Sequence, residues 1–144
     1  MSLLISPMNE QNITEVVELS AQLGYPVTLE NMTRNFRMLR ATSNQEVFVA
    51  HAEKTVGWIH VYEHLSIATG VRCEIGGLVV DEASRGKGIG AELMSKAENW
   101  AQSRGILEIS FSSRITRVDA HRFYERLGYR IQKTSHIFNK RLSS

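Results

Sequence analysis

Apolar positions in the first half of the chain follow two different periods. Two early segments carry apolar residues at helical spacing, which predicts two helices. The first ends before Gly24 and Pro26, and the second follows Thr28, a predicted N-cap, and continues to about Arg40. Shorter runs, some of them alternating, predict strands over residues 3–5, 46–52, 56–62 and 71–80. The segments 46–52 and 56–62 read as a hairpin, because only a short turn separates them.

The second half alternates between helical and strand-like segments. A helix is expected over residues 88–104, with Gly105 just past its end, and a strand over 106–111. A short helix ending at Gly128 and a last strand over 131–140 complete the pattern. The order β-αα-βββ-α-β-α-β predicts a mixed α/β fold on a central, mostly antiparallel sheet. The length and the absence of repeats or linkers predict one domain over residues 1–144.

Composition narrows the class of protein. The chain has 144 residues, 42% of them hydrophobic and 22% charged, which is ordinary for a globular domain. A net charge of +2 is too small to indicate nucleic-acid binding. No apolar run approaches the ~20 residues of a membrane span, and the first ten residues lack a secretion signal. The single cysteine excludes an internal disulfide. We therefore expect a cytoplasmic protein without a membrane partner.

A glycine-rich stretch between the 71–80 strand and the following helix is the main candidate for ligand binding. It reads VVDEASRGKGIGAEL over residues 79–93. Glycine costs ~1 kcal/mol relative to alanine inside a helix, yet Gly88 and Gly90 stand where this helix begins. Free backbone N–H groups at a helix N-terminus bind phosphates. The stretch therefore favours a phosphate ligand over a glycine-rich turn that binds nothing.

Three kinds of phosphate loop compete for this stretch. A nucleotide P-loop requires Ser or Thr after the lysine, but Gly88 follows Lys87. The dinucleotide fingerprint matches at Gly86, Gly88 and Ala91, but five residues separate it from the strand. The third pattern, R-x-x-G-x-G/A, is met by Arg85, Gly88 and Gly90.

Three motifs in register identify a family resemblance. The runs EIGGLVV, RGKGIGAEL and AHRFYERLGY lie in one order between residues 74 and 129. In their order and spacing the chain resembles the GNAT superfamily of acyl-CoA-dependent N-acyltransferases. The resemblance covers nearly the whole chain in its order of elements, and the first third in outline only. It implies acetyl-CoA as the cofactor.

The resemblance also implies where the cofactor binds. Its pyrophosphate would meet the glycine loop and the start of the helix, and its pantetheine arm would pair with the open edge of the preceding strand. Gly76 and Gly77 suggest a bulge that separates this strand from the 106–111 strand. The implied cofactor-binding residues are Leu78, Val79, Val80, Arg85, Gly86, Lys87, Gly88, Ile89, Gly90 and Ala91.

Acyl transfer to an amine requires a base, an oxyanion donor and an acid for the leaving thiolate. Glu74 is the expected base, because it stands eleven positions before Arg85, as the base glutamate does in part of the family. We expect partial burial to raise its pKa. The alternatives are a salt-bridged strand glutamate and, as in other members of the family, a different group or a water chain as the base. A free N–H of Val79 is the expected oxyanion donor. Family tyrosines at the position of Tyr124 imply that it is the acid, although its spacing also suits a packed helix face.

Other polar residues are weaker candidates. Cys73 neighbours Glu74 but should point to the opposite face, so a buried thiol is expected rather than an acyl carrier. His60, Tyr62 and His64 share one strand face, where they either line the acceptor site or pack as ordinary residues of the sheet. His121 is expected near the cofactor or the surface. No group of histidines, cysteines and acids has metal-ligand spacing, so we expect no metal.

One departure from the family pattern affects the acceptor. Arg117 replaces a common asparagine three positions before Ala120, and Arg114 lies close to it. The motif DAHRFY resembles small bacterial members that acetylate aminoalkylphosphonates or aminoglycosides. Arg114 would suit a phosphonate; alternatively both arginines are solvated or bind the nucleotide 3′-phosphate.

These observations predict an acetyl-CoA-dependent N-acetyltransferase for the primary amine of a small molecule. Tyr25, His60, His64 and Arg114 are the expected acceptor-binding residues. The alternatives are a protein lysine or N-terminal acetyltransferase and a non-catalytic CoA-binding module. No nucleic-acid partner is expected, and a homodimer is left open.

Overall fold

A computed structural model describes residues 3–22 and 24–143. The chain divides into two compact units, Met1–Phe111 and Ser112–Ser144. The first unit carries the sheet, and the second carries one helix and the C-terminal segment. Each unit is described by itself.

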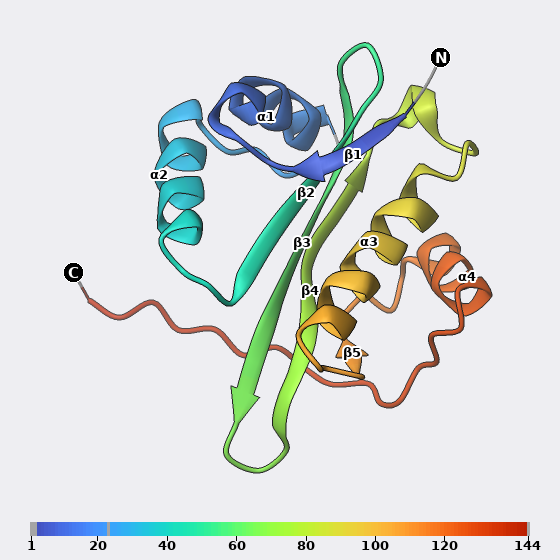
Figure 1. Ribbon diagram of the computed structural model, residues 1–144. Coiled ribbons are helices and arrows are strands. Elements are labelled where there is room, and N and C mark those ends of the chain that lie inside the picture. The colour runs from blue at the N-terminus through green and yellow to red at the C-terminus, as the bar shows by residue number, and fades with distance from the viewer. Residues whose placement is uncertain (1–2, 23, 144) are drawn as a thin grey trace. The chain divides into compact units, whose positions relative to one another are not determined.

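A five-stranded sheet forms the centre of the first unit (Figure 1). Its strands lie in sequence order: β1 (Leu4–Pro7), β2 (Gln45–His51), β3 (Thr55–Ser66), β4 (Gly70–Val80) and β5 (Ile109–Ser110). The first three pairings are antiparallel and the β4–β5 pairing is parallel. The predicted mixed α/β fold with a mostly antiparallel sheet is confirmed.

Helices cover both faces of the sheet. Since successive residues of a strand point to opposite faces, neighbouring residues of β3 contact different helices. Gly57 faces α3 (Ile89–Ser103), since a Cβ there would lie 3.0 Å from the side chain of Leu93. The next residue, Trp58, faces α1 (Ile13–Gln22), and its Nε1 donates to the Ser20 hydroxyl at 3.1 Å. Helix α2 (Leu29–Arg40) packs beside α1 on that face.

The core between α1, α2 and the sheet explains the helical spacing in the first third of the chain. Its buried members come from the loop after β1, from both helices and from β2: Met8, Ile13, Val16, Phe36, Val47 and Val49. Thr28 caps α2 as predicted, because its Oγ1 accepts from Asn31 N at 3.0 Å. Gly105, with φ of +76°, follows the last turn of α3, also as predicted.

The second unit contains α4 (Val118–Arg126), which is followed by Gly128 with φ of +96°, close to the predicted end of the short helix. The expected strand over 131–140 is wrong, because residues 130–143 have no regular secondary structure. This segment is exposed throughout and pairs with no described strand, and a strand exists only where its backbone has a partner. None of the described helices combines the length and the apolarity needed to cross a membrane.

Two strand lengths also differ from prediction. The expected strand over 106–111 is reduced to Ile109–Ser110, which pairs only with Cys73 and Glu74. Strand β3 is longer than predicted and continues through His64 to Ser66, because ten of its residues pair with β4. The polar segment between Ser66 and Gly70 forms the turn of this long hairpin. The hairpin extends beyond the rest of the sheet in Figure 1.

Candidate active site

A β-bulge interrupts β4 at the predicted glycine pair. His60 is opposite Gly77 and Val61 is opposite Ile75, so Gly76 has no partner in β3. Pairing with β5 on the other side ends at Glu74. From residue 75 to residue 80, β4 is therefore bonded to a described strand on one edge only. The predicted bulge and the separation of β4 from β5 are both confirmed.

The open edge presents alternate residues of β4. The Asp81 amide donates to the Val56 carbonyl at 2.8 Å, so its backbone faces β3. Backbone groups of successive strand residues point to opposite edges, so Val79 also faces β3, whereas Leu78 and Val80 face the open edge. Val79 was wrongly predicted as the free N–H donor. Leu78 and Val80 have the orientation that a pairing ligand needs.

The glycine loop after β4 is built to leave N–H groups free. Gly86 and Gly88 both have φ of +81°, a conformation that glycine adopts without strain, and a Cβ on either would contact nothing within 4 Å. Gly88 is the N-cap of α3 and provides no side-chain cap. Within the described chain, the amides of residues 86–88 donate to no protein acceptor. The helix dipole adds positive charge at this end of α3.

The cations of the loop are available to a ligand. Arg85 and Lys87 are exposed, and neither forms an ion pair among the described residues. Ile89, by contrast, is buried and anchors the start of α3 against the sheet. Free amides, two cations and the open edge of β4 fit a pyrophosphate joined to an amide-bearing arm, so these residues could hold coenzyme A.

Two rings explain why the bulge consists of glycines. A Cβ at Gly76 would overlap the imidazole of His60, and a Cβ at Gly77 would lie 2.8 Å from the Trp58 ring. Real Cβ atoms do not approach neighbours this closely, so a side chain at either position would displace a ring. The glycine pair thus lets His60 and Trp58 of β3 lie over the β4 backbone.

A cavity of about 440 Å³ opens beside the bulge. Its floor is the β4 backbone from Gly76 to Val79, and its walls come from Trp58 and from the segment that joins α1 to α2. Tyr25, a predicted acceptor residue, is one of the lining residues and is 52% exposed. The described lining residues are mostly apolar and carry no charge: Ser20, Gly24, Tyr25, Pro26, Val27, Met32, Trp58, Gly76, Gly77, Leu78 and Val79.

Glu74 lies on the face of the sheet that carries Tyr62, and both of its oxygens are engaged. Oε1 accepts from the Tyr62 hydroxyl at 2.8 Å. Oε2 accepts from Nε and Nη2 of Arg72 at 3.1 and 2.9 Å. Burial acts to raise the pKa of Glu74, but the hydrogen bonds from Tyr62 and Arg72, with the charges of His64 and Arg72, lower it below its usual value. The expected raised pKa is wrong, because these donors stabilise the carboxylate.

His60 stands next to this cluster in a different chemical environment. Its Nε2 lies 2.8 Å from Oε1 of Gln45, and its ring centroid is 5.3 Å from that of Tyr62. Burial lowers the pKa of His60 from its ordinary value of 6.5. The imidazole is therefore neutral at neutral pH. His60, Tyr62 and His64 alternate along β3 and share one face, as the sequence predicted.

Cys73 is the buried thiol that the sequence favoured. It is fully buried, on the face opposite Glu74, and burial and the charge of Glu63 raise the pKa of its thiol despite the opposing charge of Arg104. A thiol with a raised pKa is a poor nucleophile. Among the described residues, no group of three or more histidines, cysteines and acids could hold a metal ion.

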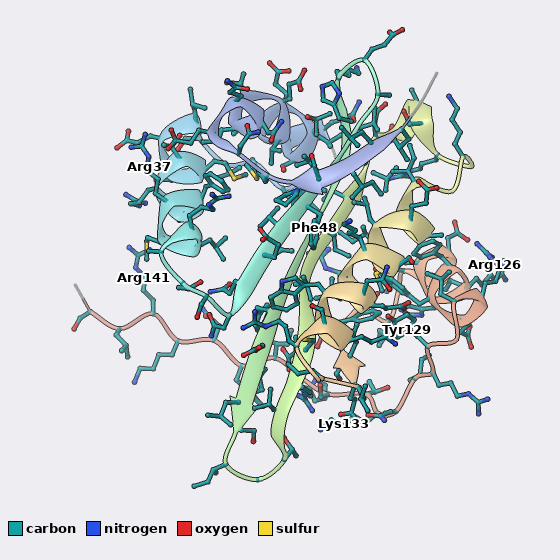
Figure 2. All side chains as sticks on the ribbon, viewed as in Figure 1. Arg37, Phe48, Arg126, Tyr129, Lys133 and Arg141 are labelled. Carbon is teal, nitrogen blue, oxygen red and sulfur yellow. The ribbon has the colours of Figure 1, made fainter. Side chains whose placement is uncertain are left out.

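Tyr124 and Arg114 belong to the second unit, and their proposed roles stay predictions. The Tyr124 ring packs against Phe123 and Tyr129, with centroids 5.2 and 6.4 Å away. His121 Nε2 lies 2.8 Å from the backbone oxygen of Arg114. Figure 2 shows Tyr129 and Arg126 as labelled members of this unit.

Three residues of the site were not expected from the sequence. Arg72 forms an ion pair with Glu74, Gln45 orients His60 through a hydrogen bond, and Trp58 forms a wall of the cavity. The spacing of Arg72 and Glu74, two apart on one strand face, was a usable signal. Gln45 and Trp58 needed the register of β2, β3 and β4, which a single sequence does not provide.

Comparison with known proteins agrees with this geometry. Residues 13–129 match the acetyltransferase (GNAT) family. The chain belongs to this family. It is 42% identical over 85 residues to an aminoalkylphosphonate N-acetyltransferase of Salmonella typhimurium, an alignment that covers 58% of this chain and 53% of that protein. It is 40% identical over 83 residues to the uncharacterized N-acetyltransferase YhdJ of Bacillus subtilis, covering 57% of this chain and 51% of the relative.

The matched region thus spans about half the length of these two GNAT relatives. Among solved structures, the aminoglycoside N-acetyltransferase AAC(6')-Iy in complex with CoA has the same fold, with a TM-score of 0.88. That similarity covers 98% of this chain and 96% of the other at 16% sequence identity. At this identity it supports the GNAT fold and nothing finer.

Proposed function

We propose that this GNAT chain is an acetyl-CoA-dependent N-acetyltransferase that acetylates the primary amine of a small molecule. The observation that carries the proposal is the open edge of β4 beside an uncapped helix. The Leu78 and Val80 backbone, the free amides of residues 86–88 and the cations of Arg85 and Lys87 follow one another along the chain. Family membership and the two relatives, both named as N-acetyltransferases, support the same conclusion.

The cofactor would supply an activated acetyl thioester. The chain would supply the binding sites for the cofactor and the acceptor, and a donor for the oxyanion. The amides of the loop and the N-terminus of α3 would bind the pyrophosphate. The outward N–H groups of Leu78 and Val80 would pair with the amide-bearing arm, and one of them would stabilise the developing oxyanion. The cavity beside the bulge would hold the acceptor, because Gly76 and Leu78 form its floor.

The finer identity of the acceptor is suggested by the relative named as an aminoalkylphosphonate N-acetyltransferase. Since no described lining residue of the cavity is charged, such acceptors would place their charged groups outside it. The Arg72–Glu74–His64 end of the same sheet face is the nearest charged region of β3 and β4. We propose that this end contacts the polar part of the acceptor.

An amine screen tests the proposal. The chain is incubated with acetyl-CoA and a panel of amines that includes 2-aminoethylphosphonate, an aminoglycoside, a phenylalkylamine and a lysine peptide. Acceptor-dependent release of free thiol, together with an acetamide product detected by mass spectrometry, is expected for a small amine. Preference for the lysine peptide would favour a protein acetyltransferase. Tight CoA binding without transfer to any amine would favour a binding module.

A further inference from the structure

We propose that His60, held by Gln45, is the base that takes the proton from the acceptor amine, through Nδ1. The inference rests on the proposed function, because it needs an amine acceptor beside the β4 bulge. It replaces Glu74 as the expected base with a residue that the sequence placed only in the acceptor site.

The His60 ring is fixed with one nitrogen directed at the bulge. With Gln45 Oε1 as its partner at 2.8 Å, Nε2 carries the proton and Nδ1 keeps its lone pair. Nδ1 is the ring atom that a Cβ on Gly76 would meet first. Gly76 is exposed and lines the cavity, whereas His60 itself is not one of the described lining residues. Nδ1 therefore lies beside a residue of the cavity floor, and an amine over Gly76 would be its nearest proton donor. In the described chain, Nδ1 has no hydrogen-bond partner.

Neighbouring groups are less suited to accept a proton. Both oxygens of Glu74 already accept hydrogen bonds, and its pKa is lowered, so it holds a proton poorly. The Tyr62 hydroxyl donates to Glu74, and its pKa is raised by burial, by that hydrogen bond and by the Glu74 charge. Tyr62 is therefore protonated at neutral pH and has no basic lone pair to offer.

The surroundings of His60 keep it neutral without an ion pair. On β2 it meets the uncharged Gln45, on β3 it meets Tyr62, and on β4 it meets two glycines. Arg72 and Glu74, the charged residues of β4 on this face, are paired with each other. Burial alone lowers the pKa of His60, so no charged group of the sheet, of α1 or of α2 shifts it.

The proton balance needs only one base. An alkylammonium with a pKa near ~10.4 loses one proton to Nδ1, directly or through one water molecule. The amine nitrogen then forms the C–N bond at the carbonyl carbon while the carbonyl electron pair moves to oxygen. When that pair re-forms the carbonyl, the C–S bond breaks and the sulfur leaves with its electron pair. The second amine proton neutralises the thiolate, and Nδ1 releases its proton to water. An ammonium and a thioester thus give an amide, a thiol and one proton.

His60→Asn is the direct test, read as kcat/KM against pH for an amine found in the screen. In the wild type, kcat/KM rises only at acidic pH and then reaches a plateau, since Nδ1 is already free at neutral pH. In the variant the reaction depends on the small fraction of free amine. We expect a loss of about 10²–10³-fold near neutral pH, and a rate that climbs about tenfold per pH unit toward the amine pKa. A variant that keeps the wild-type plateau would overturn the proposal.

Gln45→Glu tests the protonation of the same imidazole by changing the group that contacts Nε2. A carboxylate at Nε2 favours the protonated imidazole, so the acidic rise of kcat/KM should move up by about 1–3 pH units. A purely structural role of Gln45 predicts no such movement, and an unmoved rise would overturn the proposal even if His60→Asn fails to fold. His51→Asn removes an imidazole from the end of β2 and is the matched control, with an unchanged profile expected.

The outcomes separate the two proposals. A wild-type chain that acetylates no amine refutes the proposed function itself. An active wild type whose profile is unchanged in His60→Asn and Gln45→Glu refutes only the role of His60. In that case an activity loss with Glu74→Gln, with a profile that changes slope, would return the role of base to Glu74.

Discussion

The two halves of β4 belong to one continuous strand but differ in their side chains and in their pairing. In residues 70–74, the paired segment, every residue has a partner in β3, and Cys73 and Glu74 also pair with β5. In residues 75–80, the open segment, one residue is out of register and the other edge pairs with no described strand. The difference comes from a single extra residue, Gly76.

This comparison shows where chemistry can occur on the strand. The paired segment contains the side chains that look reactive in the sequence. In the structure, however, the Glu74 carboxylate is paired with Arg72, and Cys73 is buried. The open segment carries no reactive side chain, but it offers backbone donors, a cavity and the neutral ring of His60. Substitutions at or beyond the open segment should therefore change function more than substitutions in the paired segment.

The largest effect is expected for Gly88→Glu, in the loop that the open segment leads into. The new carboxylate would repel the cofactor phosphates and occupy their space at the N-terminus of α3. Saturable binding of CoA should be lost in calorimetry. Gly105→Glu is the matched control, because it places the same side chain at a glycine with φ of +76°, compared with +81° at Gly88, at the other end of α3. Unchanged CoA binding by a folded Gly88→Glu chain would contradict the cofactor site.

Tyr124→Phe is expected to have the next largest effect. If the hydroxyl relays the second amine proton to the leaving thiolate, kcat of Tyr124→Phe should fall by about 10–10³-fold while CoA affinity is largely kept. The ring contacts with Phe123 and Tyr129 remain, so the melting temperature should change little. Tyr129→Phe removes a phenol from the same unit and should leave kcat unchanged. Parallel losses of kcat and thermal stability in Tyr124→Phe would indicate a packing residue instead.

Glu74→Gln, in the paired segment, should have a smaller effect on activity. If His60 is the base, kcat/KM should fall by less than about tenfold, because Glu74 acts by holding Tyr62 and Arg72. Loss of the charged acceptor should lower the free energy of unfolding by about 1–2 kcal/mol at neutral pH. Glu53→Gln, in the exposed turn before β3, is the control for loss of a carboxylate.

The pH dependence of this stability difference has a definite sign. Since the pKa of Glu74 is lower in the folded chain than its ordinary value of 4.5, its stabilisation is complete above that value. It is lost as the pH falls through the lower pKa of the folded chain. The gap between wild type and Glu74→Gln, measured by urea unfolding, should therefore shrink below about pH 4.5. A gap that widens on acidification would mean that the pKa is raised.

Cys73→Ala should have the smallest effect on function. Its side chain is fully buried beneath α3, so no acyl group can be transferred to it without unfolding this part of the sheet. Transfer rates should stay within about twofold of the wild type, with a stability loss of about 1 kcal/mol. A covalent acetyl group on Cys73 in a mass spectrum of the working enzyme would place reactivity in the paired segment after all.

Short-range signals in the sequence determined much of the fold. The two helices of the first half, the N-cap at Thr28, the end of α3 at Gly105 and the order of the first four strands follow from local periodicity and from residues that suit special backbone conformations. The glycine loop and the bulge at Gly76 could also be predicted from the sequence. Glycine destabilises a helix start or a strand interior, so its presence there indicates a turn, a bulge or a close backbone approach. Figure 2 shows the resulting division between apolar and charged residues: Phe48 lies within the sheet, and Arg37 points away from α2.

Tertiary structure alone decided the chemistry of individual groups. The basicity of Glu74 depends on Arg72, two residues along the same strand, and on Tyr62, opposite it on β3. The neutrality of His60 depends on its burial. The direction of the Val79 amide depends on the register with β3, and the 131–140 segment lacks a partner edge despite its apolar residues. Periodicity identifies which residues share a face, but pKa values and hydrogen-bond directions depend on distances across strands, and only the folded chain sets those distances.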